Sequence, residues 1–323
     1  MNREIPVARF LARLMFSLCF IVTVASAQPF PSKSIELVNG FAPGGANDLN
    51  ARALQVSAER IFGQPLVQTF RQGGGGVVGT AEVANAAPDG YKLLLVSSGE
   101  LTAAPNLTKT SYSLYHFTFL GRLSSKPYAL VVKADAPWGK IDELLKATSS
   151  EPGKYTIGTT PTGGMFLTAQ YLIRRAGVPL TTVPYGGAGP ALTGLLGGHI
   201  HSVWAPLAAA ESHIRAGTLR LLAVSGPGRT SGHPDIPSFN EIGIDAPHVQ
   251  WIGVVGPKGI PADRLAFLRE RFARITKDPA YRQAAEKLGI EVSYASGEEF
   301  EKQVREEDQA FKALVKDIGL VVK

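Results

Sequence analysis

Short apolar runs alternate with stretches of helical periodicity along the chain from about residue 28 to its end. The apolar, β-rich runs predict strands at 35–38, 65–70, 91–96, 129–133, 155–158, 200–204, 219–224 and 251–255. The periodic stretches between them predict helices at 49–62, 77–87, 141–148, 165–176, 191–196, 207–216, 261–276 and 280–288. Such alternation is typical of α/β units built around mostly parallel sheets.

The last segment predicts one further, long helix. Ser296 and Glu299 form a capping box before it. An apolar stripe then runs from Phe300 to Ile318, and the charged residues lie off this stripe. We interpret the stripe as core packing rather than as a partner site.

A glycine-rich turn, Phe41-Ala42-Pro43-Gly44-Gly45-Ala46-Asn47-Asp48, joins the first predicted strand to the first predicted helix. Gly44 and Gly45 can take positive φ and let a ligand approach the backbone. The first N–H groups of the helix lack intrahelical partners and lie at the positive end of its dipole. The turn therefore predicts a carboxylate or phosphate site. The alternative is a simple capping turn in which Asp48, at or near the N-cap, accepts from its own backbone.

The same order of strand, small polar turn and helix recurs in the other half of the chain. Ser97-Ser98-Gly99 follows one predicted strand, and Thr159-Thr160-Pro161-Thr162-Gly163-Gly164 follows another. Tyr185-Gly186-Gly187 precedes a further helix. Ligands of open α/β sheets bind beyond the carboxyl ends of the strands, so these turns predict a cleft with two walls. The glycine run 73–76 is either another approach to the ligand or a flexible surface loop.

Residues 1–27 have the pattern of a signal peptide cleaved after Ala27, with a basic start, an apolar run at 14–24 and small residues at 25–27. A retained anchor is the alternative, but the run is short for a bilayer. The chain's one cysteine, Cys19, lies in this segment. We therefore expect export to the periplasm and a mature chain without thiols.

Removal of three Arg and one Glu with this segment would lower the formal charge from +6 to +4. No basic cluster accompanies this mild excess, so neither nucleic acid nor an anionic membrane surface is implied as a partner. A mature chain of about 296 residues is long enough for two domains.

Motifs of catalysis and cofactor binding are missing. The chain has no G-x-S-x-G elbow, Walker sequence or H-E-x-x-H helix, and its glycine runs lack the Rossmann spacing. His199 and His201 could begin a metal site, but no acidic ligands accompany them. We expect no metal, no cofactor and no enzyme activity: the cleft binds a molecule without transforming it. The alternative is an enzyme with Asp48 or His201 as its base.

Several motifs together resemble the tripartite tricarboxylate transporter substrate-binding proteins, the Bug family of periplasmic receptors. The matching segments occur in the family's order: Phe41-Ala42-Pro43-Gly44-Gly45-x-x-Asp48, Ala86-Ala87-Pro88-Asp89-Gly90-Tyr91, Val183-Pro184-Tyr185-x-Gly187-x-Gly189-Pro190, Leu195-Leu196-Gly197-Gly198 and Pro234-x-Ile236-Pro237. The resemblance implies a type II periplasmic-binding-protein fold with a ligand cleft between two α/β domains. Domain 1 would comprise 28–127 and 250–323, and domain 2 would comprise 128–249.

The resemblance also implies a small carboxylated solute, bound mainly by backbone amides and hydroxyls. The first wall would be Phe41, Gly44, Gly45, Ala46, Asn47, Asp48, Ser97 and Ser98. The second wall would be Thr159, Thr160, Thr162, Gly163, Gly164, Tyr185, Gly186 and Gly187, with Trp204 and Ala205 at a strand end facing the cleft. Ala205 stands where some members carry an acid, which favours a carboxylate without an amine. We expect a monomer whose partner is a membrane permease or, alternatively, a membrane sensor.

Overall fold

The computed structural model describes residues 29–41, 43–161 and 163–319, so the predicted signal segment and Thr162 lie outside the described residues. Its strands are β1 (Ile35–Asn39), β2 (Leu66–Phe70), β3 (Lys92–Ser97), β4 (Phe117–Lys133), β5 (Thr156–Thr159), β6 (Thr181–Pro184), β7 (Ser202–Pro206), β8 (Leu219–Val224), β9 (Val249–Pro257) and β10 (Val292–Ser296).

The α-helices are α2 (Ala46–Phe62), α3 (Val77–Ala84), α4 (Ala104–Leu107), α5 (Ile141–Ser150), α6 (Gly163–Ala176), α7 (Ala188–Leu196), α8 (Leu207–Arg215), α9 (Ala262–Ile275), α10 (Pro279–Lys287) and α11 (Gly297–Asp317). The shorter turns are η1 (Gly74–Gly76), η2 (Gly99–Ala103), η3 (Leu114–His116) and η4 (Asn240–Ile242). None of these helices has both the length and the apolar character needed to cross a bilayer.

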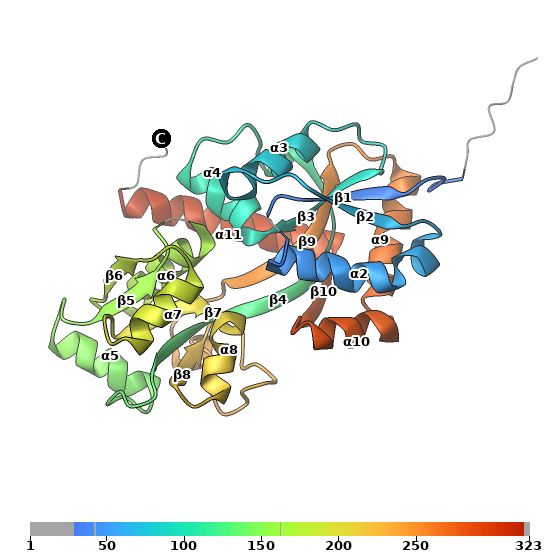
Figure 1. Cartoon of the computed structure of the whole chain (residues 1–323). Helices are drawn as coiled ribbons and strands as arrows, with labels where there is room; N and C mark the ends of the chain where they lie inside the picture. Colours follow the sequence, from blue (N-terminus) through green and yellow to red (C-terminus); the bar gives the residue numbers. More distant parts are fainter. Residues whose placement is uncertain (1–28, 42, 162, 320–323) are drawn as a thin grey trace, which may run out of the picture.

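The described strands form one sheet that runs through two lobes, in the order β2-β1-β3-β9-β4-β7-β5-β6, with β8 and β10 also paired to β4 (Figure 1). In the first lobe β1 is parallel to β2 and β3, and β9 lies antiparallel between β3 and β4. In the second lobe β5 is parallel to β6 and β7, and β4 lies antiparallel between β7 and β8. Each lobe therefore contains the same arrangement of three parallel strands beside an antiparallel one. The domain boundaries given above remain a prediction.

The long strand β4 carries the chain from one lobe into the other. Its first part, up to Pro127, pairs with β9, and its second part, from Tyr128, pairs with β7 and β8. The prediction placed only residues 129–133 in a strand. The earlier part was missed because Gly121, Ser124 and Lys126 break its apolar pattern, and because bulges shift its register against β9.

Each lobe has a core of its own, and a further apolar cluster joins them. The second-lobe core is drawn from residues 128–246. The joining cluster consists of Ala103, Leu167, Tyr171, Phe311, Leu314 and Val315, from η2, α6 and α11. The stripe of α11 thus packs on the first lobe at Phe300 and on α6 at Phe311, as core packing predicts. The predicted capping box is confirmed, since Ser296 accepts from the Glu299 N–H at 3.3 Å and Glu299 accepts from the Ser296 N–H at 2.8 Å.

Candidate functional site

The first wall is built on the N-terminus of α2, directly after β1. Gly44 has φ +87°, in the left-handed region, and Gly45 is the N-cap. The Leu49 N–H donates to the Gly45 carbonyl at 3.0 Å, so the N–H groups of residues 45–48 precede the first intrahelical bond and have no acceptor within the helix. Gly45 and Ala46 are exposed, which leaves this part of the turn open to a solute, whereas Asn47 and Asp48 are buried.

Asp48 reaches back over this turn from the first turn of α2. Its Oδ2 accepts from the Gly44 N–H at 2.7 Å and from Arg52 Nε at 3.0 Å. The capping contact considered from the sequence is therefore present, although Gly45 rather than Asp48 occupies the N-cap. Burial alone would raise the pKa of Asp48, but the bonds from Gly44 and Arg52 outweigh it and lower the pKa below its usual value.

The two bases of the enzymatic alternative do not share a site. Asp48 is an ion-paired carboxylate beside the carboxyl end of β1. His201 Nδ1 lies 2.9 Å from the Thr156 hydroxyl, at the amino end of β5 and so at the opposite end of that strand from the predicted cleft. The alternative named either residue alone as the base, and the structure places the two at separate positions.

Ser97 and Ser98 are buried at the carboxyl end of β3, beside the start of α2. Asn47 ties the two elements together, because its Nδ2 donates to the Leu95 carbonyl at 3.1 Å. Both the N–H and the hydroxyl of Ser97 donate to Glu100 Oε2, at 2.6 and 2.8 Å. Glu100 was missed from the sequence, although a charged residue so close to a buried strand end was a usable signal.

The second wall is the start of α6, which begins at Gly163 with φ +85°. The Thr159 hydroxyl donates to the Met165 carbonyl at 3.1 Å, and the Thr168 hydroxyl donates to the Gly164 carbonyl at 2.7 Å. These bonds fix the first turn of α6 beside the end of β5. Thr160 lies between β5 and this turn.

The remaining predicted residues of the second wall lie at the ends of β6 and β7. The Tyr185 N–H donates to the Thr159 carbonyl at 2.8 Å, and Gly186 and Gly187 follow at the start of α7. Trp204 and Ala205 are buried in β7. The Trp204 indole N–H donates to the Thr168 hydroxyl at 2.9 Å, so this buried ring is bonded to α6.

The two walls meet at Ser98 and Gly164. A Cβ built on Gly164 would lie 3.8 Å from Ser98 Oγ and 3.0 Å from the Tyr128 hydroxyl. Tyr128 belongs to the second half of β4, and its hydroxyl hydrogen bonds with Thr168 and Ser98, one from each lobe. Burial raises the pKa of Tyr128 despite these bonds, so the hydroxyl keeps its proton. Sequence reasoning missed Tyr128, which stands in no motif.

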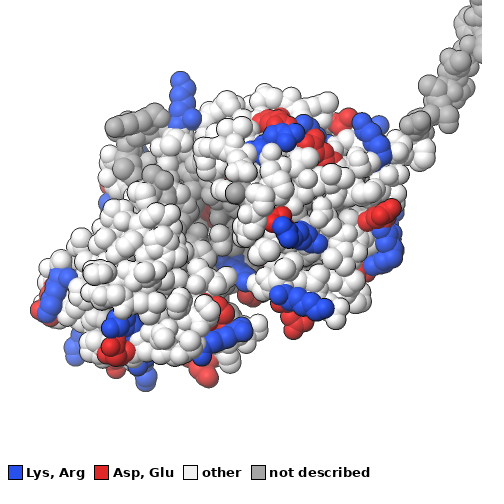
Figure 2. Space-filling view, in the orientation of Figure 1, with Lys and Arg blue, Asp and Glu red and all other residues white. Residues whose placement is uncertain are grey.

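The surface is hollowed where the lobes face each other (Figure 2). One cavity of about 120 Å³ lies between them, with Ala46 of the first wall on one side and Ala208 of α8 on the other. Its other lining residues are Leu49, Asn50, Ser124, Lys126, Gln250, Ile252, Leu288, Gly289 and Ile290. Lys126, also missed from the sequence, donates to the Gly289 carbonyl, and burial lowers its pKa. Space between the lobes therefore reaches the first turn of α2.

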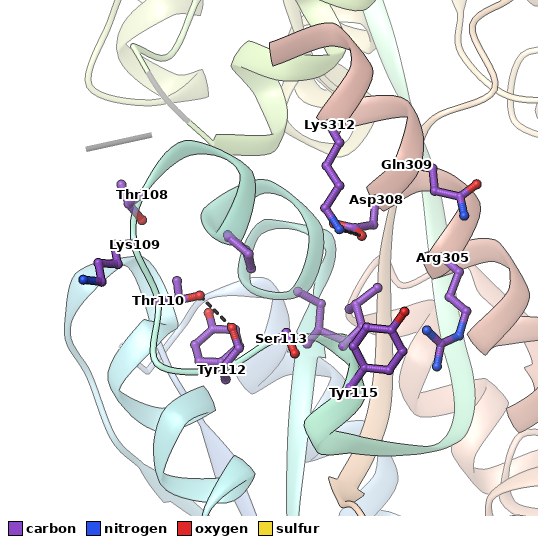
Figure 3. A pocket seen from close by; sticks show the side chains of 13 residues that line it. Thr108, Lys109, Thr110, Tyr112, Ser113, Tyr115, Arg305, Asp308, Gln309 and Lys312 are labelled. Carbon is purple, nitrogen blue, oxygen red and sulfur yellow. Dashed lines mark hydrogen bonds and ion pairs between the residues drawn. The ribbon is translucent and has the colours of Figure 1, made fainter. Parts of the chain in front are cut away.

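A larger cavity of about 490 Å³ lies on the first lobe, between the segment after α4 and α11 (Figure 3). Its basic side chains include Arg305, which is paired with Glu301 and lies 5.1 Å from the Tyr115 ring centre, and Lys312, which is paired with Asp308. No predicted ligand residue lines this cavity. Two of its three lining cations are paired with neighbouring carboxylates, and Lys109 is the third.

Among the described residues, no three His, Cys, Asp or Glu side chains are grouped closely enough to bind a metal ion. Apart from Asp48, which is already paired with Arg52, the predicted ligand residues that the structure describes offer backbone N–H groups, hydroxyls and an amide. Such a set can bind an anion by oriented dipoles without supplying a charged partner.

Comparisons with known proteins show which family and which solved structures this chain resembles. The family described as tripartite tricarboxylate transporter family receptor matches residues 50–320. Protein BugT of Bordetella pertussis is 29% identical, over 94% of this chain and 94% of BugT. A TctC solute binding protein from Polaromonas, solved without ligand, is similar with 30% identity and a TM-score of 0.82, over 89% of this chain and 99% of that one. MatC from Rhodopseudomonas palustris, solved with bound malate, is similar with 26% identity and a TM-score of 0.69, over 88% and 100%. These likenesses confirm the predicted two-domain α/β binding-protein fold.

Proposed function

Because the chain belongs to the tripartite tricarboxylate transporter receptor family, we propose that it captures a small carboxylate between its two lobes and delivers it to a membrane permease. The mature protein acts in the periplasm after removal of residues 1–27. The observation that carries the proposal is the meeting of the two walls, where the start of α6 lies against Ser98 at the end of β3. Two helix N-termini from different lobes thus face one solute.

A carboxylate fits this site because of which donors remain available. The first-turn N–H groups of α2 and α6 have no acceptor within their helices, and they lie at the positive ends of the helix dipoles. No Lys or Arg occurs among the predicted ligand residues, so dipoles rather than ion pairs neutralise the anion. The malate bound to MatC, a dicarboxylate without an amine, is a solute of this class.

We propose that the solute contacts the described residues of both walls and closes the lobes around itself. Only a solute that interacts better with the closed state can shift the balance toward closure, so contact with both lobes is needed. The joining cluster and the strand β4, which runs through both lobes, provide the connection about which such closure would occur.

The test is a melting-temperature and tryptophan-fluorescence screen of the mature protein against malate, succinate, adipate, citrate and aspartate. A ligand at 100 times its Kd stabilises the folded state by about 2.7 kcal/mol, which gives a readily measured shift. We expect at least one amine-free carboxylate to shift both signals, and aspartate to act more weakly than succinate. No response to any carboxylic acid would overturn the proposal.

A further inference from the structure

Glu100 is a buried carboxylic acid behind the first wall. It is 0% exposed and lies in η2, directly after β3. Its Oε2 accepts both donors of Ser97. This side chain thus fixes the end of β3, and Asn47 at the start of α2 is tied to the same strand through the Leu95 carbonyl.

The other oxygen of this carboxyl lies between the two glycine loops of the first lobe. A Cβ built on Gly40 would lie 2.9 Å from Glu100 Oε1, and one built on Gly76 would lie 2.8 Å from it. Gly40 directly precedes Phe41 of the first wall. Within the described part of the chain, Oε1 has no hydrogen-bond partner. The carboxyl therefore lies close behind the loop that would face a solute.

No basic side chain compensates a charge at this position in the described structure. Tyr112 contacts Glu100 only at its backbone carbonyl, at 2.8 Å. The ionisable groups of the elements packed around Glu100 are buried acids, are paired with other side chains or lie at the far ends of their helices. They are Glu36 of β1, Lys92 of β3, Arg71 after β2, Glu82 of α3, Asp48 and Arg52 of α2, Glu307, Asp308 and Lys312 of α11, and Arg174 and Arg175 of α6. Burial raises the pKa of Glu100 to about 8, although the bonds from Ser97 oppose this.

We propose that Glu100 is a positioning residue whose proton must be present for the site to accept a carboxylate. When protonated, the side chain is neutral and fixes Ser97. When ionised, it adds a buried negative charge behind the wall that receives the solute's own carboxylate, and the two repel. The inference rests on the proposed function, in that the solute's carboxylate binds at the first wall.

Linkage fixes the direction of the effect. The solute favours the protonated acid, so affinity is full below a pH of about 8 and is lost as the pH rises through that value. If the ionised form binds negligibly, Kd rises about tenfold between pH 7 and pH 9, and about half a proton is taken up per solute bound at pH 8. Malate is fully ionised throughout this range, so its own titration does not contribute.

The experiment is calorimetry with malate at pH 7, 8 and 9, in buffers of different ionisation enthalpy, on the mature wild type, Glu100→Gln and Glu59→Gln. Gln keeps an acceptor for Ser97 and stays neutral, so E100Q should bind equally at pH 7 and pH 9, without proton uptake. Glu59 is exposed on α2, and E59Q should match the wild type. The proposal is overturned if E100Q loses affinity with pH as the wild type does, or if the wild type takes up no proton. The wild-type measurement decides even if E100Q does not fold.

A ligand-free measurement separates this inference from the proposed function. Carbon-13 NMR of the glutamate carboxyl carbons, with E100Q as the assignment control, should show Glu100 titrating with a midpoint near pH 8. A midpoint below pH 6 overturns the inference even if malate binds. If instead no carboxylic acid binds at pH 7, the proposed function fails, and the inference fails with it.

Discussion

Glu307 of α11 should carry a proton at neutral pH, for a geometric reason. Its Oε2 accepts from the Trp251 indole N–H at 3.1 Å, and its Oε1 contacts the Thr102 hydroxyl. That hydroxyl has one hydrogen but two acceptors within reach, because the Ser98 carbonyl lies 2.7 Å away as well. A carbonyl oxygen can only accept, whereas a carboxyl donates once it is protonated, so both contacts are satisfied together when Glu307 carries a proton.

The energetic consequence follows from the burial of this side chain. Burial raises the pKa of Glu307 to about 7, and the bond from the Trp251 indole N–H opposes this rise. Because the folded-state pKa lies above the unfolded value, the contribution to stability is full below the unfolded pKa and is lost as the pH rises through about 7. At about 1.4 kcal/mol per pKa unit, the loss between pH 5 and pH 8 is on the order of 1–3 kcal/mol. The nearby His248 is neutral throughout, because burial lowers its pKa to about 4.

Glu307→Gln tests this reasoning. The Gln amide can donate to Thr102 and its carbonyl can accept from Trp251, so it mimics the protonated acid at every pH. We expect urea denaturation to show E307Q equal to the wild type at pH 5 and more stable by about 1–3 kcal/mol at pH 8. Glu306→Gln, on the exposed side of the same helix, should change neither value. A variant that is less stable than the wild type at both pH values would mean that the carboxyl is ionised, and would refute the argument.

Three further changes probe the joining of the lobes and the local structure. Gly164→Ala places a Cβ 3.0 Å from the Tyr128 hydroxyl, so malate affinity measured by calorimetry should fall about tenfold, whereas Gly228→Ala, in open space, should leave it unchanged. Leu167→Ala in the joining cluster should lower the free energy of unfolding by about 2–4 kcal/mol in urea, and a loss below 1 kcal/mol would show that the cluster packs loosely. The bonds of Asp278 to Ser57 and Arg60 lower its pKa to about 2, so their contribution should be present above about pH 4 and vanish as the pH falls toward 2. Asp278→Asn should flatten that part of the stability profile, and an unchanged acid limb would contradict this.

Local sequence patterns predicted the ends of β1, β3 and β5 and the starts of the helices that follow them, because glycine, hydroxyl and capping residues leave short-range signals. The prediction of 219–224 coincides with β8. Edge strands β6 and β10 were missed, since they are short, are only partly buried and lack an apolar run. The first half of β4 was missed because it leaves one lobe for the other, and no local pattern encodes that crossing.

From the sequence, only the loop residues of the candidate site could be predicted. Tyr128, Glu100 and Lys126 stand in no motif, and their places in the site depend on which strands are neighbours in the folded sheet. Trp204 was expected at the cleft from the family resemblance, and the structure shows its ring buried beneath α6. A long-range contact such as that between Ser98 and Gly164 requires the strand order of both lobes, which the alternation of elements alone does not fix.

Some backbone N–H groups of the site are already bonded to side chains of the protein itself. This limits the donors that a solute can contact. The Gly44 N–H is bonded to Asp48 and the Ser97 N–H to Glu100, so neither is free for an anion unless a side chain moves. The donors that remain by helix geometry are the first-turn N–H groups of α2 and α6, one set in each lobe. A solute that contacts only one set would gain nothing from closure. We expect a solute with acceptors for both to stabilise the closed state through its second contact, so that the same pair of helix starts would set both affinity and closure.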